Sequence, residues 1–300
     1  MSIIRYRNIF FAVTGAIVAA AVVSLVVFGL RVGIDFAGGS LVEIRYDGAR
    51  PSQEAAEDVL RDAGFENFSL RETGESGFTL RSPMLSDEQR SELSEVFSYQ
   101  GGTARVEQLS EVGPTIGKEL RNKALIALAL VLVCILFFIA FAFRKVSKPV
   151  SSWIYGLIAL ITLLHDVIVP AGFFALLGHF TGAQIDTLFV TAILTILGFS
   201  VHDTIVVFDR VRENLRINQE RNRREDFAET AGRSLGQTFV RSINTSLTVL
   251  FTLLVLYFIG PESTRVFALT LFVGIAAGTY SSIFLATPLL VVVERWRRRR

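Results

Sequence analysis

The sequence is poor in cysteine and in charged residues. Its single cysteine, Cys134, lies in an apolar run, so no intrachain disulfide can form and a small packing role is expected. Charged residues make up 19% of the 300 residues, whereas 51% are hydrophobic. One soluble core cannot bury so much apolar surface, which indicates a membrane protein. The net charge of +2 is too small to indicate nucleic-acid binding, and no metal site or cofactor is expected.

Several apolar segments are long enough to cross a bilayer, whose hydrocarbon core is about 30 Å thick. The six segments are 9–30, 124–143, 153–177, 187–208, about 243–259, and 266–293. Arg5 and Arg7 precede the first segment, as basic residues precede the core of a signal peptide. Because this apolar run is longer than a typical signal-peptide core and five more spans follow, we expect an uncleaved first helix.

The distribution of lysine and arginine predicts which side of the membrane each end faces. Eighteen of these residues fall on one side, in the N-terminal tail, the 144–150 turn, the 209–241 loop and the C-terminal tail. The short loops on the other side hold only Arg265. Since lysine and arginine are enriched in cytoplasmic loops, both termini are predicted to be cytoplasmic.

The long segment 31–123 between the first two spans is predicted to fold as a small extracytoplasmic α+β domain. Strand-like alternation and helical spacing occur in the order β-α-β-β-α-β, over 40–46, 52–63, 65–71, 78–82, 86–97 and 103–109. This order is that of a ferredoxin-like split βαβ fold.

Local signals support this domain. Val42, Ile44 and Tyr46 fall on one face of the first strand, and Ser86 with Gln89 forms a helix capping box. The first helix has an apolar stripe of Ala55, Ala56, Val59, Leu60 and Ala63. The domain sequence has no histidine and no glycine-rich phosphate loop, so a binding or lever role is expected rather than catalysis.

The chain is thus expected to have six parts. They are the tail with the first span (1–30), the α+β domain (31–123), spans two to four (124–208), a basic cytoplasmic loop (209–241), spans five and six (242–293), and an Arg-rich cytoplasmic tail (294–300). In the loop, Phe227, Ala231, Leu235 and Phe239 recur four residues apart, which predicts an amphipathic helix leading into the fifth span. The loop is otherwise expected to be a solvated connector at the headgroup surface.

The stretch 198–214 contains the main candidate site. Ser200, His202, Asp203 and Thr204 lie inside the apolar span 187–208. An ionisable side chain in hydrocarbon costs roughly 2.5–3.5 kcal/mol on insertion scales, so it should face protein or water. Asp203 is therefore either a residue that caps a kink or joins two helices, or a carrier of a proton or another ion. The second interpretation is favoured because carboxylates within membrane spans are usually functional.

Other polar residues lie within or beside the spans. His165 and Asp166 are near the middle of the third span, and Arg241 and Asn244 begin the fifth. Arg241 is expected at a depth similar to that of Asp203 on an adjacent span, where its distance would control proton uptake by the carboxylate. Alternatively, Arg241 only snorkels to the interface. Asp166 is the second candidate, expected to be a helix-packing or water-site residue.

Two patterns in the spans favour structural rather than catalytic roles. Gly274 and Gly278 have the spacing of close helix packing. An aspartyl-protease site would require Asp166 and Asp203 to share a proton, but their expected depths differ by several residues. The Gly-x-Gly-Asp motif of intramembrane aspartyl proteases is absent from the sequence, so an enzyme is not expected.

Motifs spread over essentially the whole chain resemble those of one known family. They are 33–40 (GIDFAGGS), 112–120 (VGPTIGKEL), 198–214, 241–246, and the pattern of Gly274, Gly278, Ser281 and Ser282. In this order they resemble the SecF branch of the SecD/SecF family of bacterial protein-export membrane proteins, which is related to the RND transporters. His202 is a departure, because many members have Asn just before the acid.

The resemblance implies an α-helical polytopic membrane protein with six transmembrane helices, half of an RND-like twelve-helix unit, and an α+β ferredoxin-like extracytoplasmic domain. It implies a SecD partner chain and a location in the bacterial inner membrane. It also implies association with the SecYEG translocon and YajC, and contact with translocating unfolded preproteins and membrane lipid. By motif matching, Asp203 is the family's transmembrane acid and Arg241 its basic partner, with a second acid supplied by SecD.

The implied function is to couple the proton motive force to late steps of protein translocation. A unit charge crossing 100 mV releases about 2.3 kcal/mol, enough to bias a lever domain whose two states differ by a few kcal/mol. Two alternatives remain: a structural assembly subunit with no proton path of its own, and half of an RND-type small-molecule exporter. The structural alternative predicts that replacing Asp203 leaves function intact.

Overall fold

The chain folds as two compact units, seen in a computed structural model that describes residues 2–98, 103–144 and 150–299. One unit comprises Met1–Arg31 with Ile126–Arg300, and the other comprises Val32–Leu125. Three basic residues that contribute to the predicted orientation, Lys145, Lys148 and Arg300, lie outside the described residues.

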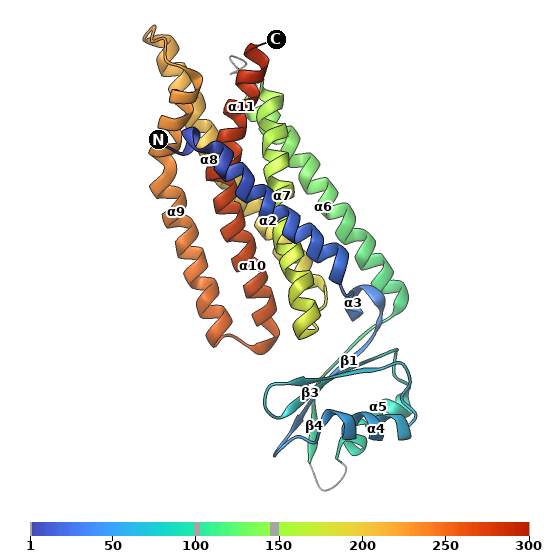
Figure 1. The fold of residues 1–300 in the computed structure, drawn as a ribbon. Helices are drawn as coiled ribbons and strands as arrows, with labels where there is room; N and C mark the ends of the chain where they lie inside the picture. Colours follow the sequence, from blue (N-terminus) through green and yellow to red (C-terminus); the bar gives the residue numbers. More distant parts are fainter. Residues whose placement is uncertain (1, 99–102, 145–149, 300) are drawn as a thin grey trace. The chain divides into compact units, whose positions relative to one another are not determined.

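The six predicted spans are confirmed as long apolar helices. Each is long and apolar enough to cross a membrane: α2 (Arg7–Phe28), α6 (Pro114–Ala142), α7 (Ser152–Thr181), α8 (Thr187–Glu220), α9 (Phe227–Ile259) and α10 (Glu262–Ser281), which continues through the π-helical segment η2 (Ser282–Ala286) into α11 (Thr287–Arg298). A short helix, α1 (Ser2–Arg5), precedes α2 and contacts α11. Both termini lie toward the same end of the helical unit (Figure 1). The side of the membrane that this end faces stays a prediction.

The first half of the segment 209–241 is mostly helical and not a loop, contrary to the prediction, whereas the amphipathic helix predicted from Phe227 onward is confirmed as the start of α9. Helix α8 continues to Glu220 and α9 already begins at Phe227. Polar side chains join the two helices there: Asn214 Nδ2 donates to Ser234 Oγ at 2.8 Å, and Asn218 Nδ2 to Thr230 Oγ1 at 3.0 Å. These buried hydrogen bonds let a charged segment pack as a helical hairpin, which its charge content alone does not reveal.

Helix α6 begins at Pro114, well before the expected start near Ala124. Proline suits the first turn of a helix because its missing N–H would have no partner there. Lys123 then pairs with Glu119 one turn earlier at 2.7 Å, an arrangement that supports a helix surface. The polar residues before the apolar run therefore extend the helix instead of ending it.

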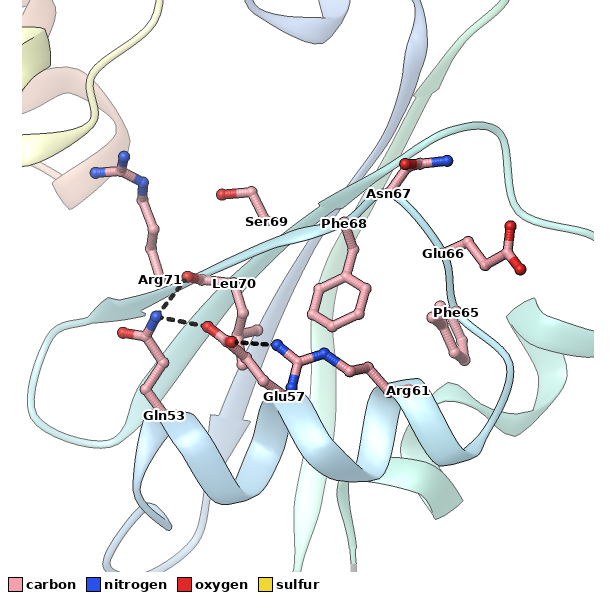
Figure 2. Close-up of a pocket in the computed structure, with 10 residues that line it drawn as sticks. All are labelled: Gln53, Glu57, Arg61, Phe65, Glu66, Asn67, Phe68, Ser69, Leu70 and Arg71. Atoms are coloured by element: carbon pink, nitrogen blue, oxygen red, sulfur yellow. Dashed lines mark hydrogen bonds and ion pairs between the residues drawn. The ribbon is translucent and has the colours of Figure 1, made fainter.

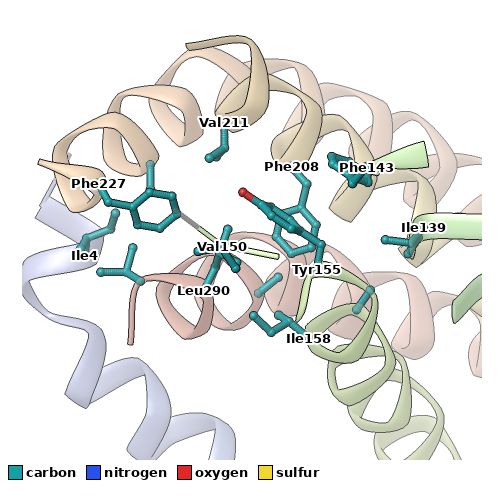
Figure 3. Close-up of a cluster of buried hydrophobic side chains, with 14 residues drawn as sticks. Ile4, Ile139, Phe143, Val150, Tyr155, Ile158, Phe208, Val211, Phe227 and Leu290 are labelled. Carbon is teal, nitrogen blue, oxygen red and sulfur yellow. The ribbon is translucent and has the colours of Figure 1, made fainter. Parts of the chain in front are cut away.

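Aromatic packing holds one end of the helical unit together. The rings of Phe143 and Tyr155 are stacked with centroids 5.2 Å apart, and Phe208 meets Tyr155 edge-on at 5.3 Å. All three are buried in a cluster that also contains Ile4 and Leu290 (Figure 3). Since Phe208 lies five residues after the candidate acid on α8, this cluster fixes the helix that carries the site.

The second unit confirms the predicted ferredoxin-like order. Its elements are β1 (Gly39–Tyr46), α4 (Gln53–Asp62), β2 (Ser69–Thr73), β3 (Gly77–Ser82), α5 (Asp87–Phe97) and β4 (Ala104–Val112). The sheet order is β2-β3-β1-β4 with antiparallel neighbours, as the split βαβ arrangement requires. Ser86 and Gln89 form both hydrogen bonds of the predicted capping box.

Some boundaries in this unit differ from those predicted. Strand β2 begins at Ser69 and not at Phe65, because Asn67 has a positive φ of 55° that interrupts an extended chain. Phe65 is nevertheless buried in the domain core. Ala63, expected on the apolar stripe of the first helix, is exposed beyond the end of α4.

The motifs around 33–40 and 112–120 pack against each other. Gly38 has φ +82° and Gly39 has φ +119°, values that side-chain-bearing residues rarely adopt. A Cβ on Gly38 would lie 2.8 Å from Pro114 Cα, and a Cβ on Gly117 would lie 3.2 Å from the Phe36 carbonyl carbon. Glycine is therefore needed where the short helix α3 (Ile34–Ala37) meets the start of α6.

Candidate functional site

The principal candidate acid, Asp203, is buried between helices of the membrane unit. Its side chain lies on α8 and the residue is 3% exposed. Ser246 Oγ on α9 donates to Asp203 Oδ2 at 3.5 Å, and Thr279 Oγ1 on α10 lies 2.7 Å from Ser246 Oγ in hydrogen-bond contact. Asp203 thus accepts from one neutral hydroxyl group, which in turn contacts a second.

The structure places the predicted basic partner, Arg241, on the outer surface of α9. Arg241 is exposed on the chain, as are His202 and Asn244, whereas Thr204 is buried. Within the part of the chain that the structure describes, no ion pair within 4.0 Å joins Arg241 to Asp203, although the guanidinium acts electrostatically on the carboxyl. Direct pairing of the two side chains therefore stays a prediction for the assembled protein.

A second carboxyl, Asp166, is the centre of a fully buried polar cluster. Asp166 Oδ1 lies 2.7 Å from His165 Nδ1. Asp166 Oδ2 accepts hydrogen bonds from Ser200 Oγ and from Ser281 Oγ, the latter at 2.8 Å. Three helices, α7, α8 and α10, thus contribute to one site. The sequence marks these residues as polar and intramembrane, but their contact depends on helix packing and could not be deduced from spacing.

Close helix packing brings these groups together. A Cβ on Gly278 would lie 2.9 Å from Ser200 Cβ, and a Cβ on Gly274 would collide with the side chain of Ile196. Small residues at a helix interface permit such an approach of the two backbones. Ser281 is followed at once by η2, a π-helical segment of the kind often found at functional sites.

Helices α8 and α9 each have a row of mainly polar residues that is exposed on the chain, and we call the two rows the α8–α9 polar face. On α8 the exposed residues recur every three or four positions: Thr191, Thr195, Gly198 and His202. On α9 they recur with the same spacing: Arg241, Thr245, Thr248 and Thr252. Arginine and histidine within a bilayer-spanning region are expected to face protein or water and not lipid. This α8–α9 polar face is therefore unsuited to direct contact with hydrocarbon.

The α+β unit has an open pocket of about 780 Å³ between α4 and β2 (Figure 2). Its polar lining groups pair with one another: Gln53 Nε2 donates to the Leu70 carbonyl oxygen at 3.2 Å, and Arg61 pairs with Glu57 at 3.0 Å. Among the described residues, no group of three or more His, Cys, Asp or Glu side chains is placed to hold a metal ion. The hydrogen bond from Gln53 thus joins α4 to β2 at this pocket.

The fold and site together define a class: a polytopic membrane protein with six apolar helices, buried carboxyl groups and one ferredoxin-like domain. Residues 93–296 match the family model described as protein export membrane protein SecD/SecF, C-terminal, and residues 23–49 match the SecD/SecF GG motif. The chain belongs to the SecD/SecF family.

Individual relatives agree with this assignment. The chain is 43% identical to protein translocase subunit SecF of Thermobaculum terrenum, over 98% of this chain and 94% of that protein. It is 38% identical to the SecF subunit of Anaerolinea thermophila, over 99% and 96% respectively.

A solved structure also matches the whole chain. The crystal structure of SecDF, a translocon-associated membrane protein from Thermus thermophilus, superimposes with a TM-score of 0.85 and 34% identity, covering 100% of this chain. The match covers only 39% of the SecDF chain. The present chain therefore corresponds to one part of that longer protein.

Proposed function

We propose that this chain is the SecF-type subunit of a SecD–SecF complex that couples proton entry to the export of proteins through the SecYEG channel. The observation that carries the proposal is the burial of Asp203, 3% exposed, on a membrane-spanning helix, where its carboxyl accepts a hydrogen bond from the Ser246 hydroxyl. A carboxylate whose hydrogen-bond partner is a hydroxyl can take up a proton, whereas a close ion pair with a permanent cation would keep it ionised.

The energy available from protons is sufficient for the proposed work. One charge crossing 100 mV releases about 2.3 kcal/mol, and a two-state domain needs only a few kcal/mol of bias to change its populations. The ferredoxin-like unit Val32–Leu125 is joined through its two ends to α2 and α6, so movements of these helices would act on it directly. Its role in the proposal is that of a lever outside the membrane.

The α8–α9 polar face supports the need for a second chain. A SecD-type partner docked there would cover Arg241 and His202 and bring them into a protein environment near Asp203. In Thermus SecDF, the region that is similar to this chain is joined to further sequence in one longer protein. This arrangement supports a SecD-type partner for the present chain. Association with SecYEG and YajC, residence in the inner membrane and cytoplasmic termini belong to the same proposal.

The proposed role is transport and not catalysis. Asp166 and Asp203 bind different hydroxyl groups, and no hydrogen bond joins the two carboxyls among the described residues. An aspartyl-protease dyad would require them to share one proton. Membership of a protein-export family also favours polypeptides over small molecules as the exported cargo.

The deciding experiment is Asp203→Asn, assayed for export driven by a proton gradient in membrane vesicles with normal subunit levels. Asparagine keeps the volume and can still accept from Ser246, but it cannot ionise. Asp209→Asn is the matched control, because Asp209 lies on the same helix at the surface and pairs with Arg212 at 2.6 Å.

We expect Asp203→Asn to abolish the part of export that depends on the gradient, and Asp209→Asn to retain it. Equal export by Asp203→Asn and the wild type would favour the structural-subunit alternative.

A further inference from the structure

We propose that Asp166, paired with His165, is a second proton-binding site of the membrane helices and exchanges its proton with Asp203. The inference rests on the proposed function, which it extends from one carboxyl to two. Its basis is the contact between the Asp166 carboxyl, 0% exposed, and donors from its own helix and two others.

The cluster is built to hold a proton in either of two positions. With the proton on His165 Nδ1, the ring donates to Asp166 Oδ1 across 2.7 Å, and both serine hydroxyls donate to Oδ2 of the carboxylate. With that proton moved to Asp166 Oδ1, and with a second proton on His165 Nε2 in both states, the carboxyl donates to the neutral ring across the same contact. The geometry therefore suits a pair of groups that pass a proton from one to the other.

The ion-pair contact of the Asp166 carboxyl among the described residues is with a histidine. Among the described residues, Asp166 has an ion-pair contact with His165 and none with lysine or arginine. The other titratable groups nearby are Asp203, one turn along α8 from the Ser200 donor, and Tyr280, whose ring stacks on His165 at 6.4 Å. A buried carboxylate without a permanent counter-charge is costly, so a proton is the natural means of neutralising it.

His165 has an unused polar atom that a structural role does not explain. Its Nε2 is buried and has no hydrogen-bond partner among the described residues, and the whole residue is 5% exposed. Leaving a buried ring nitrogen without a hydrogen bond is energetically costly. If His165 Nε2 receives or releases a proton, directly or through water, this function explains why the atom has no hydrogen-bond partner.

Residues that contact the two carboxyls are near one another on α8 and on α10. Ser200, which donates to Asp166, lies three residues before Asp203 on α8, a rise of about 4.5 Å along the helix. On α10, Ser281 contacts Asp166, and Thr279 contacts the Ser246 hydroxyl that donates to Asp203. In the exchange, Asp166 gives up one proton and Asp203 accepts one, while each intervening hydroxyl or water accepts one and releases one.

The helix that bears Ser281 has a built-in irregularity. The π-helical segment η2 begins at the next residue, Ser282, where the regular hydrogen-bond ladder of the helix is interrupted. A shift of Ser281 away from Asp166 would remove one of the two hydrogen bonds to Oδ2. Helix movement and proton uptake at Asp166 are thereby coupled.

The test is pH-difference infrared spectroscopy of the full chain assembled with a SecD-type partner in lipid. Two separate carboxyl bands should change with pH, one lost in Asp166→Asn and the other in Asp203→Asn. Ser281→Ala should shift the Asp166 band by removing one hydrogen bond. Ser282→Ala is the matched control, since its Oγ donates to the Thr279 carbonyl oxygen at 3.0 Å and not to Asp166.

Proton flux provides a second readout. Asp166→Asn should lower it by about a hundredfold, the usual contribution of a positioned proton-transfer group. One titrating carboxyl band, lost only in Asp203→Asn, would overturn the proposal. If Asp166→Asn does not assemble, Ser281→Ala is used instead, and a spectrum in which no carboxyl band shifts would also overturn the proposal. A third outcome separates the two proposals. If both bands titrate but export does not depend on the proton gradient, the second proton-binding site is supported and the proposed function is refuted.

Discussion

The contact between α8 and α10 gives a prediction with a definite sign. We compare Gly278→Ala with Gly198→Ala, the same substitution on two membrane helices. A Cβ at Gly278 would lie 2.9 Å from Ser200 Cβ and 3.2 Å from its hydroxyl oxygen, so one of the backbones must shift. A Cβ at Gly198 meets nothing within 4 Å among the described atoms.

The magnitude follows from three terms. Replacing glycine by alanine in a helix gains about 1 kcal/mol. Overpacking costs about 1–3 kcal/mol, and weakening the hydrogen bond from Ser200 to the Asp166 carboxyl costs about 1.5–3 kcal/mol more. The free energy of unfolding of Gly278→Ala should therefore fall by about 1.5–5 kcal/mol, whereas that of Gly198→Ala should be unchanged or should rise by up to about 1 kcal/mol.

The assay is reversible unfolding of the purified chain in detergent, followed by circular dichroism for both variants and the wild type. Changes of the same sign and size in both variants would refute the claim that Gly278 is required for the close approach of α8 and α10.

Two further predictions concern the α+β unit and the topology. Gly39→Ala should destabilise the α+β unit by about 2–4 kcal/mol, because φ is +119° and the new Cβ would lie 2.5 Å from the Ser82 carbonyl oxygen. Hydrogen exchange of the backbone amides of strand β1 measures this change, and unchanged protection would contradict the prediction. After Cys134 is replaced, a membrane-impermeant thiol reagent applied from outside should label a cysteine introduced at Glu75 and should not label one introduced at Arg223. The reverse labelling pattern would contradict the predicted orientation.

The parts of the fold that local patterns encode could be predicted from the sequence. Apolar runs identify the membrane helices because their length must match the bilayer. In the α+β unit, the Ser86–Gln89 box gives the start of α5 because both of its hydrogen bonds are formed within one turn. Boundaries that depend on packing were less accessible: the continuation of α8 to Glu220 relies on Asn214 and Asn218 meeting side chains of α9.

In the candidate site, too, some features could be predicted from the local sequence and others depend on packing. Asp203 stands out because an acid inside an apolar span is costly, and this is a property of the local sequence alone. The partners of Asp166 come from Ser200 and Ser281, which lie 34 and 115 residues away in the chain. No periodicity relates such distant residues, so their contact follows only from how three helices pack. The π-helical turn after Ser281 likewise has no simple sequence signature.

The central claim is that protons cross the membrane through Asp203. The most direct measurement is proton flux into liposomes that contain this chain with a SecD-type partner, driven by an imposed gradient and followed with a pH-sensitive dye. The account predicts flux for the wild type and for Asp209→Asn, and flux at the level of protein-free liposomes for Asp203→Asn. Wild-type flux through correctly assembled Asp203→Asn would contradict the account.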